Sequence, residues 1–324
     1  MTIKEIGKPV KQHLDKFDKF YKDAMKSDVT LLNLVLSYVS KKKGKQVRPV
    51  LVFLAADLCG GVNERSYVGA AMVELLHNAT LIHDDVVDEA SERRGMASIN
   101  ASWNNKIAVL IGDYLLSRGL LTSVENDEVD FLRVTSNAVK KMSEGELLQI
   151  QKSKDFKIDE KTYFQIISYK TASLMSSCCE IGAISSSDDP EVHEKLRRFG
   201  ELVGLAFQIR DDIFDYKSSS SLIGKPVGND LKEKKITLPL IYSFSKTETS
   251  ASKVIVRKIK NGNLSKDDIV EIVNFATDNG GIDYAEARAR EFTAEAVSIL
   301  QNFPDSEAKT SLIDFANFVV DREK

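Results

Sequence analysis

Two aspartate clusters are the residues of this sequence whose types and spacing most clearly indicate chemistry. Each has members at i, i+1 and i+4; the first trio is Asp84, Asp85 and Asp88, and the second trio is Asp211, Asp212 and Asp215. On a helix that turns 100° per residue, the second and third members lie about 100° and 40° from the first. Each trio therefore projects from one side of its helix. Both also stand near the C-terminal end of a predicted helix, where the helix dipole disfavours negative charge.

A bound cation explains why carboxylates gather there. Two carboxylates ~4 Å apart repel by about 4 kcal/mol at an effective dielectric near 20. One trio alone is as easily read as a solvated acidic face, because 29% of the residues are charged. Two trios within apolar sequence favour a cation, and ligands that are all oxygens select a hard one such as Mg²⁺, with Mn²⁺ as the expected substitute. The trios thus predict two walls of a magnesium–phosphate site.

Basic residues near the trios are suited to binding diphosphate. Any one of them alone is best read as a surface charge, but arginine forks and lysine point charges together provide the donors that phosphate oxygens need. The candidates are Lys45, Arg48, Arg93, Arg94, Lys170, Lys225, Lys232, Lys234 and Lys235. His77 lies two turns before Asp84, and we expect it to face the same cavity and donate to a phosphate oxygen. His83 is interpreted as a partly buried structural histidine.

Long amphipathic helices are expected to carry these residues. Apolar residues recur at helical spacing, and the chain has only 6 prolines and 17 glycines among 324 residues, so we predict an all-α protein. The predicted helices cover 4–26, 29–40, 49–60, 64–90, 106–124, 129–151, 160–185 and 190–216, with shorter helices in the C-terminal third. Residues 217–230 are rich in Ser and Gly, and they are predicted to form a loop that is disordered without substrate.

Charge and cysteine content exclude several classes of protein. The net charge is −3 with no basic stripe, so no nucleic-acid partner is expected. The 3 cysteines, Cys59, Cys178 and Cys179, lack metal-site spacing and indicate a reducing compartment. The N-terminus has no apolar signal segment, and no run approaches about 18 apolar residues. We therefore expect a cytoplasmic protein that is not exported and does not span a membrane.

An ordered set of motifs resembles the trans-isoprenyl diphosphate synthases, also called polyprenyl synthetases. Between residues 40 and 245 the motifs are "GKQVRP", "ELLHNATLIHDDVVDEASERRG", "GDYLL", "YKTASL", "GLAFQIRDDIFD" and "GKPVGNDLKEKKITLPL", and the C-terminal "DFANFVVDREK" is compatible. The resemblance implies a single all-helical domain over residues 1–324, with about ten core helices around a deep central cavity. It also implies a homodimer.

The resemblance assigns roles to the candidate residues. The Mg²⁺ ions would be held by Asp84, Asp85, Asp88, Asp211 and Asp212, with Asp215 supporting the second wall. The allylic diphosphate would be bound by Arg93, Lys170, Thr171, Gln208, Lys225 and Lys235, and Lys170 also counts as catalytic. The diphosphate of isopentenyl diphosphate would be bound by Lys45, Arg48, His77 and Arg94. Two departures, Gln46 in place of a frequent Arg and "RRGMAS" without the usual "PT", remove no metal ligand.

The implied reaction is Mg²⁺-dependent prenyl transfer. Metal and basic residues would stabilise the negative charge on the departing diphosphate, so that the allylic C–O bond ionises. The double bond of isopentenyl diphosphate then attacks the allylic cation. A proton is lost to the released diphosphate, because the motifs contain no evident protein base.

Two small residues ahead of the first trio predict a long product. In the family an aromatic side chain at these places stops chain growth, whereas Ala79 and Thr80 leave the tunnel open. We expect an all-trans product in the hexaprenyl to octaprenyl range, with Phe53 and Leu148 as candidate deeper floors. Each added unit buries five carbons, worth about 3–4 kcal/mol. Product release is therefore expected to limit turnover and to be helped by peripheral membrane contact.

Several alternatives were weighed against this interpretation. The nearest is a short-chain synthase that makes geranylgeranyl or farnesyl diphosphate. A non-catalytic subunit of a heteromeric synthase usually has eroded aspartate motifs, and both trios are intact here. A terpene cyclase or head-to-head condensing enzyme would not be expected to keep "GKQVRP" together with "DDVVDEASERRG". A di-iron bundle needs two Glu-x-x-His pairs, which "EVHE" does not supply.

Overall fold

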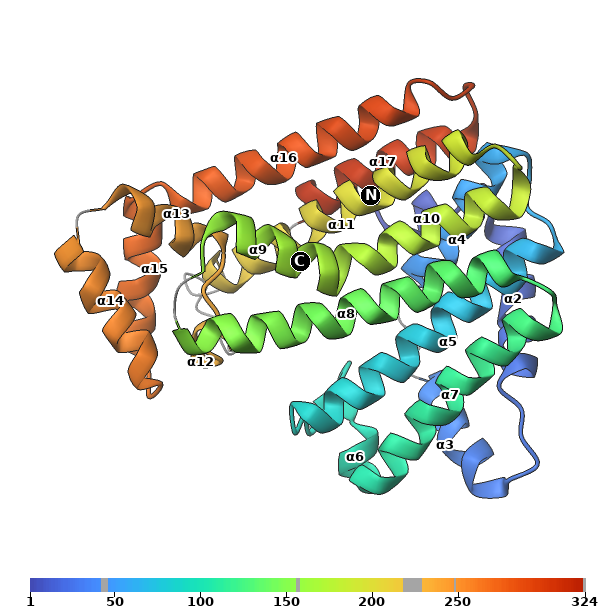
Figure 1. Ribbon diagram of the computed structural model, residues 1–324, viewed down its shortest axis with the longest axis horizontal. Helices are drawn as coiled ribbons and strands as arrows, with labels where there is room; N and C mark the ends of the chain where they lie inside the picture. The colour runs from blue at the N-terminus through green and yellow to red at the C-terminus, as the bar shows by residue number, and fades with distance from the viewer. Residues whose placement is uncertain (42–45, 156–157, 218–228, 248, 323–324) are drawn as a thin grey trace. The chain divides into compact units, whose positions relative to one another are not determined.

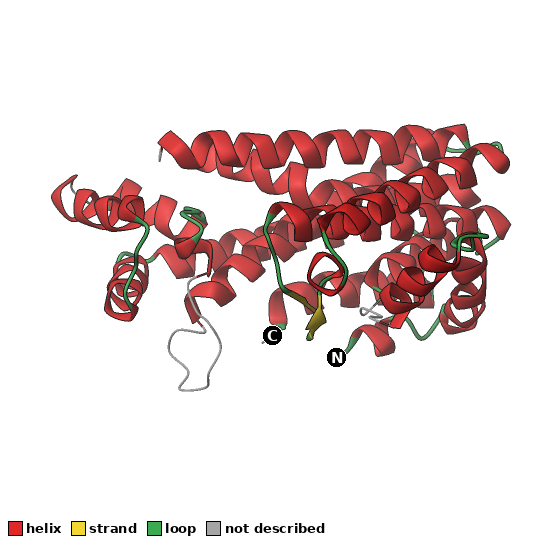
Figure 2. Cartoon of the chain, turned by 90° about the horizontal axis from the view of Figure 1, so that it is seen from below, coloured by secondary structure: helices red, strands yellow, loops and turns green. Residues whose placement is uncertain are grey.

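The structure, a computed structural model, describes residues 1–41, 46–155, 158–217, 229–247 and 249–322. Within those ranges the chain is helical apart from short loops and one two-stranded hairpin (Figure 2). The elements are α1 (Ile3–Ile6), α2 (Lys11–Ala24), α3 (Thr30–Lys41), α4 (Val47–Cys59), α5 (Glu64–Val87), β1 (Glu92–Arg93), β2 (Met96–Ala97), α6 (Ile99–Ser102), α7 (Asn105–Glu125), α8 (Val129–Asp155), α9 (Glu160–Ile167), the π-helical turn η1 (Ser168–Ala172), α10 (Ser173–Ser186), α11 (Pro190–Lys217), α12 (Asn229–Lys232), α13 (Leu238–Lys246), α14 (Thr249–Asn261), α15 (Lys266–Asp278), α16 (Gly281–Leu300) and α17 (Glu307–Asp321). The predicted all-α class is confirmed.

The chain divides into two compact units that interleave along the sequence. Unit 1 comprises Met1–Ala138, Leu174–Arg198 and Leu300–Phe315. Unit 2 comprises Val139–Ser173, Phe199–Ile299 and Ala316–Lys324. The first aspartate trio belongs to unit 1 and the second to unit 2. The single domain over residues 1–324 and its deep central cavity stay predictions.

Unit 1 is built around the helix that ends in the first trio. Asn63 caps the start of α5 by accepting a hydrogen bond from the Ser66 backbone, and the helix then runs without a breaker to Val87. It packs beside α7 (Figure 1), and Gly112 makes this approach possible, since a Cβ there would lie 2.2 Å from His83 Nε2. Because α4 is apolar on nearly every side, it is buried from Pro49 to Ala56.

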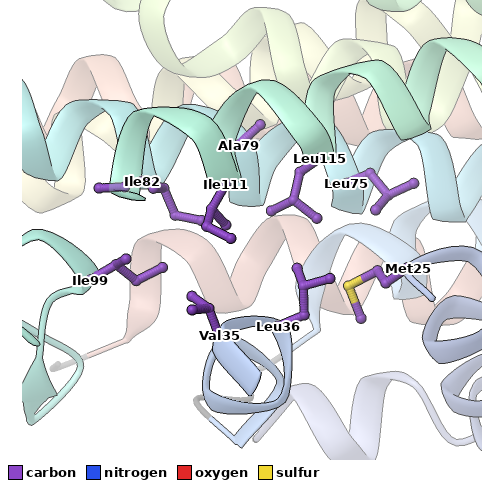
Figure 3. Close-up of a cluster of buried hydrophobic side chains, with 10 residues drawn as sticks. Met25, Val35, Leu36, Leu75, Ala79, Ile82, Ile99, Ile111 and Leu115 are labelled. Atoms are coloured by element: carbon purple, nitrogen blue, oxygen red, sulfur yellow. The ribbon is translucent and has the colours of Figure 1, made fainter. Parts of the chain in front are cut away.

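A cluster of buried side chains lies beside the predicted chain-length position Ala79 (Figure 3). Its members come from α3, α5 and α7 and the segments next to them, and they are Met25, Val35, Leu36, Leu75, Ala79, Ile82, Ile99, Ala108, Ile111 and Leu115. Apolar side chains of this kind contribute about 1.5–3 kcal/mol each on full burial. The cluster therefore both stabilises unit 1 and surrounds Ala79 with apolar atoms.

Unit 2 is organised around the second trio on α11. Gly204 lets α11 approach the π-helical turn η1, because a Cβ at that position would lie 2.5 Å from the Ala172 Cα atom. A second close approach is between α16 and α13, where a Cβ at Gly281 would lie 2.1 Å from the Pro239 carbonyl oxygen. Both contacts require a glycine for space alone.

Some predicted helices differ from the observed ones. The single helix predicted over residues 4–26 is wrong, because the chain breaks between α1 and α2, where Pro9 lacks a backbone donor. The helix predicted to reach residue 90 ends at Val87, with Asp88 as its C-cap. The segment 160–185 is interrupted by η1. The helices predicted at 106–124, 129–151 and 190–216 are confirmed within a few residues, whereas most of the loop at 217–230 lies outside the described residues.

The helix α7 corrects the prediction that no segment of the chain is apolar enough to span a membrane. In the described part of the chain, α7 is long and apolar enough to cross a membrane by length and composition alone. Of its most apolar stretch, 39% is buried inside the protein. A single helix of this kind is weak evidence, since core helices of globular proteins pass the same test.

Candidate active site

The first trio stands at the C-terminal end of α5. Asp85 is buried, with 4% of its surface exposed, whereas Asp84 and Asp88 are exposed. The guanidinium of Arg93 donates to Asp85 Oδ1 from Nε at 2.7 Å and from Nη2 at 2.5 Å. Asp88 continues the helix ladder by donating its backbone N–H to the Asp84 carbonyl oxygen at 2.8 Å. One carboxylate of this trio is thus held by an arginine, and the other two face solvent.

A tight hairpin brings the two adjacent arginines back to α5. Arg93 pairs with Met96 across β1 and β2, and the two turn residues, Arg94 and Gly95, have φ of 55° and 74°. Positive φ at both central residues defines the hairpin turn that favours glycine at its second position. Asn100 fixes the base of the hairpin, because its Nδ2 donates to the carbonyl oxygens of Asp85 at 3.1 Å and Ala90 at 3.0 Å.

Arg48, Glu74, His77 and Arg94 form a second charged group in unit 1. Burial raises the pKa of Glu74, and the charges of Arg48 and Arg94 oppose that rise. Burial lowers the pKa of Arg48, and Glu74 opposes that shift in turn. Among the described residues, Arg48 Nε and Glu74 Oε2 are buried without a hydrogen-bond partner. Such atoms at a concave site are the groups that a ligand satisfies.

His77 belongs to the same group in its uncharged form. Its pKa is lowered well below the ordinary value, first by burial and then by the charges of Arg48, Arg94 and Arg93. At neutral pH the imidazole therefore presents one N–H donor and adds no positive charge. His77 therefore lies within electrostatic reach of Arg48 and Arg94, and its predicted role in binding diphosphate with them stays a prediction.

The second trio is surrounded by other side chains of unit 2. Asp212 is buried, with 4% of its surface exposed, and each of its carboxylate oxygens accepts one hydrogen bond. Tyr163 OH donates to Oδ2 at 2.7 Å, and Gln208 Nε2 donates to Oδ1 at 2.8 Å. The Thr171 hydroxyl donates to Gln208 Oε1 at 2.6 Å. This chain of hydrogen bonds joins α9, η1 and α11.

The other two aspartates of this trio have different partners. Arg322, which follows α17, forms an ion pair with Asp211 through Nη2, and its guanidinium also stacks 4.1 Å from the centre of the Phe207 ring. Arg322 is held in turn by Arg210, whose Nη2 donates to the Arg322 carbonyl oxygen at 2.9 Å. Asp215 Oδ2 accepts the Asp230 backbone N–H at 3.1 Å.

Negative charge accumulates in this part of unit 2. Burial raises the pKa of Asp212 to about 8, and the charge of Asp230 adds to the shift. Burial also raises the pKa of Asp230 to about 6, with a further rise from Asp215 and an opposing contribution from Lys235. These carboxylates are therefore short of positive charge in the protein alone, which is the condition that a bound cation relieves.

A cavity of about 110 Å³ in unit 2 brings four of the six predicted allylic-diphosphate residues together, without Arg93 and Lys225. Its lining includes Lys170, Thr171, Gln208, Asp212, Asp230 and Lys235. Lys170 pairs with Glu146 and donates to Gln149 Oε1 at 3.1 Å, and Lys235 pairs with Glu233. Lys170 and Thr171 lie in η1, and single π-helical turns are frequent at functional sites.

Other predicted residues are placed as follows. Lys45 and Lys225 lie outside the described residues. Ala79 belongs to the buried cluster of unit 1, whereas the half-buried Thr80 donates its hydroxyl to the His77 carbonyl oxygen at 2.9 Å. Phe53 is buried against Phe17 and Tyr67, and Leu148 is half-buried. His83 is partly exposed and lies 3.4 Å from Asp113 Oδ1, as expected for a structural histidine.

One protein-family model matches most of the chain, including the six ordered motifs. The polyprenyl synthetase family model matches residues 29–276. The chain belongs to this family. Its membership confirms the enzyme class predicted from the motifs, a trans-prenyltransferase of isoprenoid biosynthesis.

Named relatives match this polyprenyl synthetase over almost its whole length. The geranyl-diphosphate-specific all-trans-nonaprenyl-diphosphate synthase of Rhodobacter capsulatus is 38% identical and aligns over 98% of this chain and 97% of its own. The octaprenyl diphosphate synthase of Escherichia coli is 33% identical, with 100% of both chains covered. A crystal structure of a Caulobacter crescentus polyprenyl synthase complexed with calcium and isoprenyl diphosphate superposes with a TM-score of 0.90, at 30% identity, over 100% of this chain and 98% of that one.

Sequence reasoning missed several residues of this polyprenyl synthetase site. Tyr163 stands in no motif, and its one signal is a tyrosine on the apolar side of α9. Asp230 falls within "GKPVGNDLKEKK" but was not singled out. Arg322 is distant in sequence from Asp211, and Glu74 is a lone acid in an apolar helix. A charged residue among apolar neighbours, as at Glu74, was the usable signal.

Proposed function

We propose that this polyprenyl synthetase uses Mg²⁺ to condense isopentenyl diphosphate head-to-tail with an allylic diphosphate, and that it makes a long all-trans product. The observation that carries this proposal is the cavity of unit 2, where Lys170 and Lys235 stand beside the buried carboxylate of Asp212 and the half-buried one of Asp230. A pocket with cations and carboxylates together suits a diphosphate bridged by a divalent metal. The nonaprenyl and octaprenyl names of two relatives support the product class.

The donor set fits Mg²⁺. Asp84, Asp85 and Asp88 would hold metal from one trio, and Asp211 and Asp212 from the other, with Asp215 in support. Among the described side chains, no three His, Cys, Asp or Glu residues form a metal site by themselves. This suits Mg²⁺, which typically takes one or two carboxylates and completes its coordination with waters and substrate phosphates. Bound Mg²⁺ would neutralise charge on the departing diphosphate.

The protein's own residues would bind and orient the two substrates. The allylic diphosphate would be held, while its C–O bond ionises, by Arg93, Lys170, Thr171, Gln208, Lys225 and Lys235. Arg48, Arg94 and neutral His77, with Lys45, would hold the diphosphate of isopentenyl diphosphate so that its double bond meets the allylic cation. The proton lost afterwards would go to the released diphosphate.

The experiment that tests this function is a product analysis. Purified protein is incubated with Mg²⁺, farnesyl diphosphate and radiolabelled isopentenyl diphosphate, and the dephosphorylated products are sized by chromatography. We expect one dominant chain longer than geranylgeranyl. A product that stops at geranylgeranyl would favour the short-chain alternative, and no incorporation with any allylic primer would favour a non-catalytic subunit.

We also propose that Ala79 keeps the product tunnel open. Its neighbours in the buried cluster are apolar, so a growing prenyl chain beside it would meet no polar group. Ala79→Tyr should shorten the product, and overpacking should cost about 1–3 kcal/mol of stability. An unchanged product distribution from folded Ala79→Tyr would exclude this assignment, and Val129→Tyr, at the exposed start of α8, is the control.

A homodimer is proposed from the exposed face of α7. Val109, Leu110, Leu120, Leu121 and Val124 are all exposed and fall within about 120° of one another around the helix. Asp113 and Ser117 lie between them on the same face. Exposed apolar residues that gather on one helix face are typical of interfaces. Light scattering should give the mass of two chains, and Leu110→Glu with Leu121→Glu should give one. If the double variant stays dimeric, the face is instead a candidate for the membrane contact that we propose for product release.

A cytoplasmic location is proposed from the cysteines. Cys59, Cys178 and Cys179 are free, and burial raises the pKa of Cys59 and Cys178 to about 12, so both are inert thiols. Fractionation of the native cell should place the protein in the soluble or peripheral-membrane fraction of the cytoplasm.

A further inference from the structure

Tyr163 makes a hydrogen bond that the proposed reaction does not yet explain. Its hydroxyl donates to Asp212 Oδ2 at 2.7 Å, opposite the Gln208 amide on Oδ1. The ring is 3% exposed and stacks edge-on against Phe164, with 5.4 Å between ring centres. Phe164 in turn packs edge-on against Phe292 of α16, with 5.5 Å between ring centres, so α9 is held in place and the hydroxyl stands at one defined place beside the second trio.

The partner of Tyr163 is unusual for a buried tyrosine in this chain. Tyr216 is equally buried and lies one helical turn after Asp212, but its hydroxyl bonds to the Thr237 hydroxyl at 2.9 Å. A tyrosine needs only one neutral partner to satisfy its O–H. Tyr163 instead contacts a buried carboxylate, whose charge burial disfavours. The two tyrosines thus offer a matched pair that differs in the group each hydroxyl contacts.

The geometry fixes how Asp212 can receive a cation. An ionised carboxylate has about four lone-pair positions, two on each oxygen. Tyr163 and Gln208 each occupy one, on opposite oxygens, and so prevent rotation of the carboxylate while leaving one position per oxygen. Asp212 also lines the cavity that contains Lys170 and Lys235. Side chains that hold a metal-binding carboxylate in this way typically change metal affinity or activity by about 10–100-fold when removed.

We propose that Tyr163 is a positioning residue that holds the Asp212 carboxylate in the orientation needed to bind the metal–diphosphate of the allylic substrate. This inference rests on the proposed function, because it takes Asp212 as a metal ligand. Tyr163 acts through Asp212, whose other carboxylate oxygen is held by Gln208. It is not expected to contact isopentenyl diphosphate, whose proposed ligands belong to unit 1.

The test compares Tyr163→Phe with Tyr216→Phe, each of which removes one hydroxyl from a buried tyrosine. Tyr163→Phe should raise the Mg²⁺ concentration for half-maximal rate by about tenfold, raise KM for the allylic substrate, and leave KM for isopentenyl diphosphate unchanged. Tyr216→Phe should change none of the three. A readout without catalysis is the rise in melting temperature on adding Mg²⁺ with inorganic diphosphate, which should shrink only in Tyr163→Phe.

A double-variant series decides whether Tyr163 acts through Asp212. The readout is again the rise in melting temperature that Mg²⁺ and inorganic diphosphate cause. In an Asp212→Asn background, adding Tyr163→Phe should change this rise by less than about twofold. If Tyr163→Phe alone does not fold, recovery of folding in the double variant reports the same coupling. Two results would overturn the inference. One is that Tyr163→Phe and Tyr216→Phe have equal Mg²⁺ requirements, and the other is that Tyr163→Phe has the same effect in the Asp212→Asn background as in the wild type. A different result would contradict the proposed function alone. In that case the wild type shows no prenyl transfer, but Mg²⁺ with inorganic diphosphate still raises the melting temperatures of the variants in the expected pattern.

Discussion

The two aspartate trios share one spacing but lie in different surroundings. In the first, Asp84 and Asp88 are exposed, and Arg93 on a hairpin holds Asp85. In the second, Tyr163, Gln208, Arg322 and the Asp230 backbone all donate to the trio. The same i, i+1, i+4 pattern can therefore be left open at a helix end or organised in advance by its neighbours. We expect the first trio to depend on the ligand for its geometry and the second to depend on the protein.

The largest effects should come from removing one carboxylate charge in either trio. Asp84→Asn and Asp212→Asn should each lower kcat by about 10²–10³-fold, because charge on the departing diphosphate would lose electrostatic stabilisation. Steady-state rates at saturating Mg²⁺ measure this. Asp130→Asn, at an exposed ion pair of unit 1, is the control and should retain activity. If only one trio proved sensitive, the idea of two metal-binding walls would be wrong.

Arg93→Gln should reveal how much the first trio depends on the arginine that holds Asp85. Asp85 would remain buried without its ion pair, and the partial exposure of Arg93, 35%, limits the loss to about 1–2 kcal/mol. Thermal unfolding should show a lower melting temperature, and KM for the allylic substrate should rise about tenfold. Arg133→Gln breaks an exposed pair and should change neither quantity. A variant with wild-type KM would show that the Arg93 contact is structural only.

Arg322→Gln tests the outermost contact of the second trio. Asp211 would lose its ion pair, but Asp212 would keep both donors, so the Mg²⁺ requirement should rise by less than about tenfold. Rates across an Mg²⁺ titration measure the change. Arg290→Gln, which breaks the exposed pair with Asp321 next to Arg322, is the matched control. A larger effect than that of Tyr163→Phe would make Arg322 the principal support of the trio.

The smallest expected effect is the contribution of Asp212 and Asp230 to the pH dependence of stability. Burial raises the pKa of Asp212 to about 8 and that of Asp230 to about 6, whereas an unfolded aspartate titrates near 4. Between those values the folded protein keeps a proton that the unfolded chain has lost, so the free energy of unfolding falls as pH rises. Without metal, the melting temperature should fall by roughly 2–4 °C from pH 6 to pH 8.

Asp212→Asn should flatten the upper part of this pH profile. The amide carries no charge to bury, and the Tyr163 hydroxyl can turn to accept from it. Scanning calorimetry in chelator measures the profile, and Asp84→Asn should leave it unchanged because that carboxylate is exposed. An equal slope in the wild type and Asp212→Asn would place the titration elsewhere.

The sequence predicted the helices and the trios but not the supports around them. Helical periodicity is local, so 129–151 and 190–216 could be assigned from the residues alone. The contacts of Tyr163 and Arg322 join segments 49 and 111 residues apart, and no local pattern encodes them. The hairpin at Arg94 and Gly95 was not predicted, although a glycine after two polar residues favours such a turn. The family resemblance predicted ligand residues, whereas the hydrogen bonds that orient those ligands required the fold.

The π-helical turn η1 has a consequence for how this region can change. A π-helical turn accommodates one more residue than an α-helical turn, so it acts as a built-in insertion. Deleting Ser168 would convert η1 to an α-helical turn and shift the residues of that turn by up to about 100° around the axis, so that Thr171 would leave Gln208 although no side chain of the cavity has changed. The position of Lys170 and Thr171 is therefore encoded by residue count as well as by residue type. Across related chains, this stretch should accept substitutions at its exposed positions and resist gains or losses of a single residue.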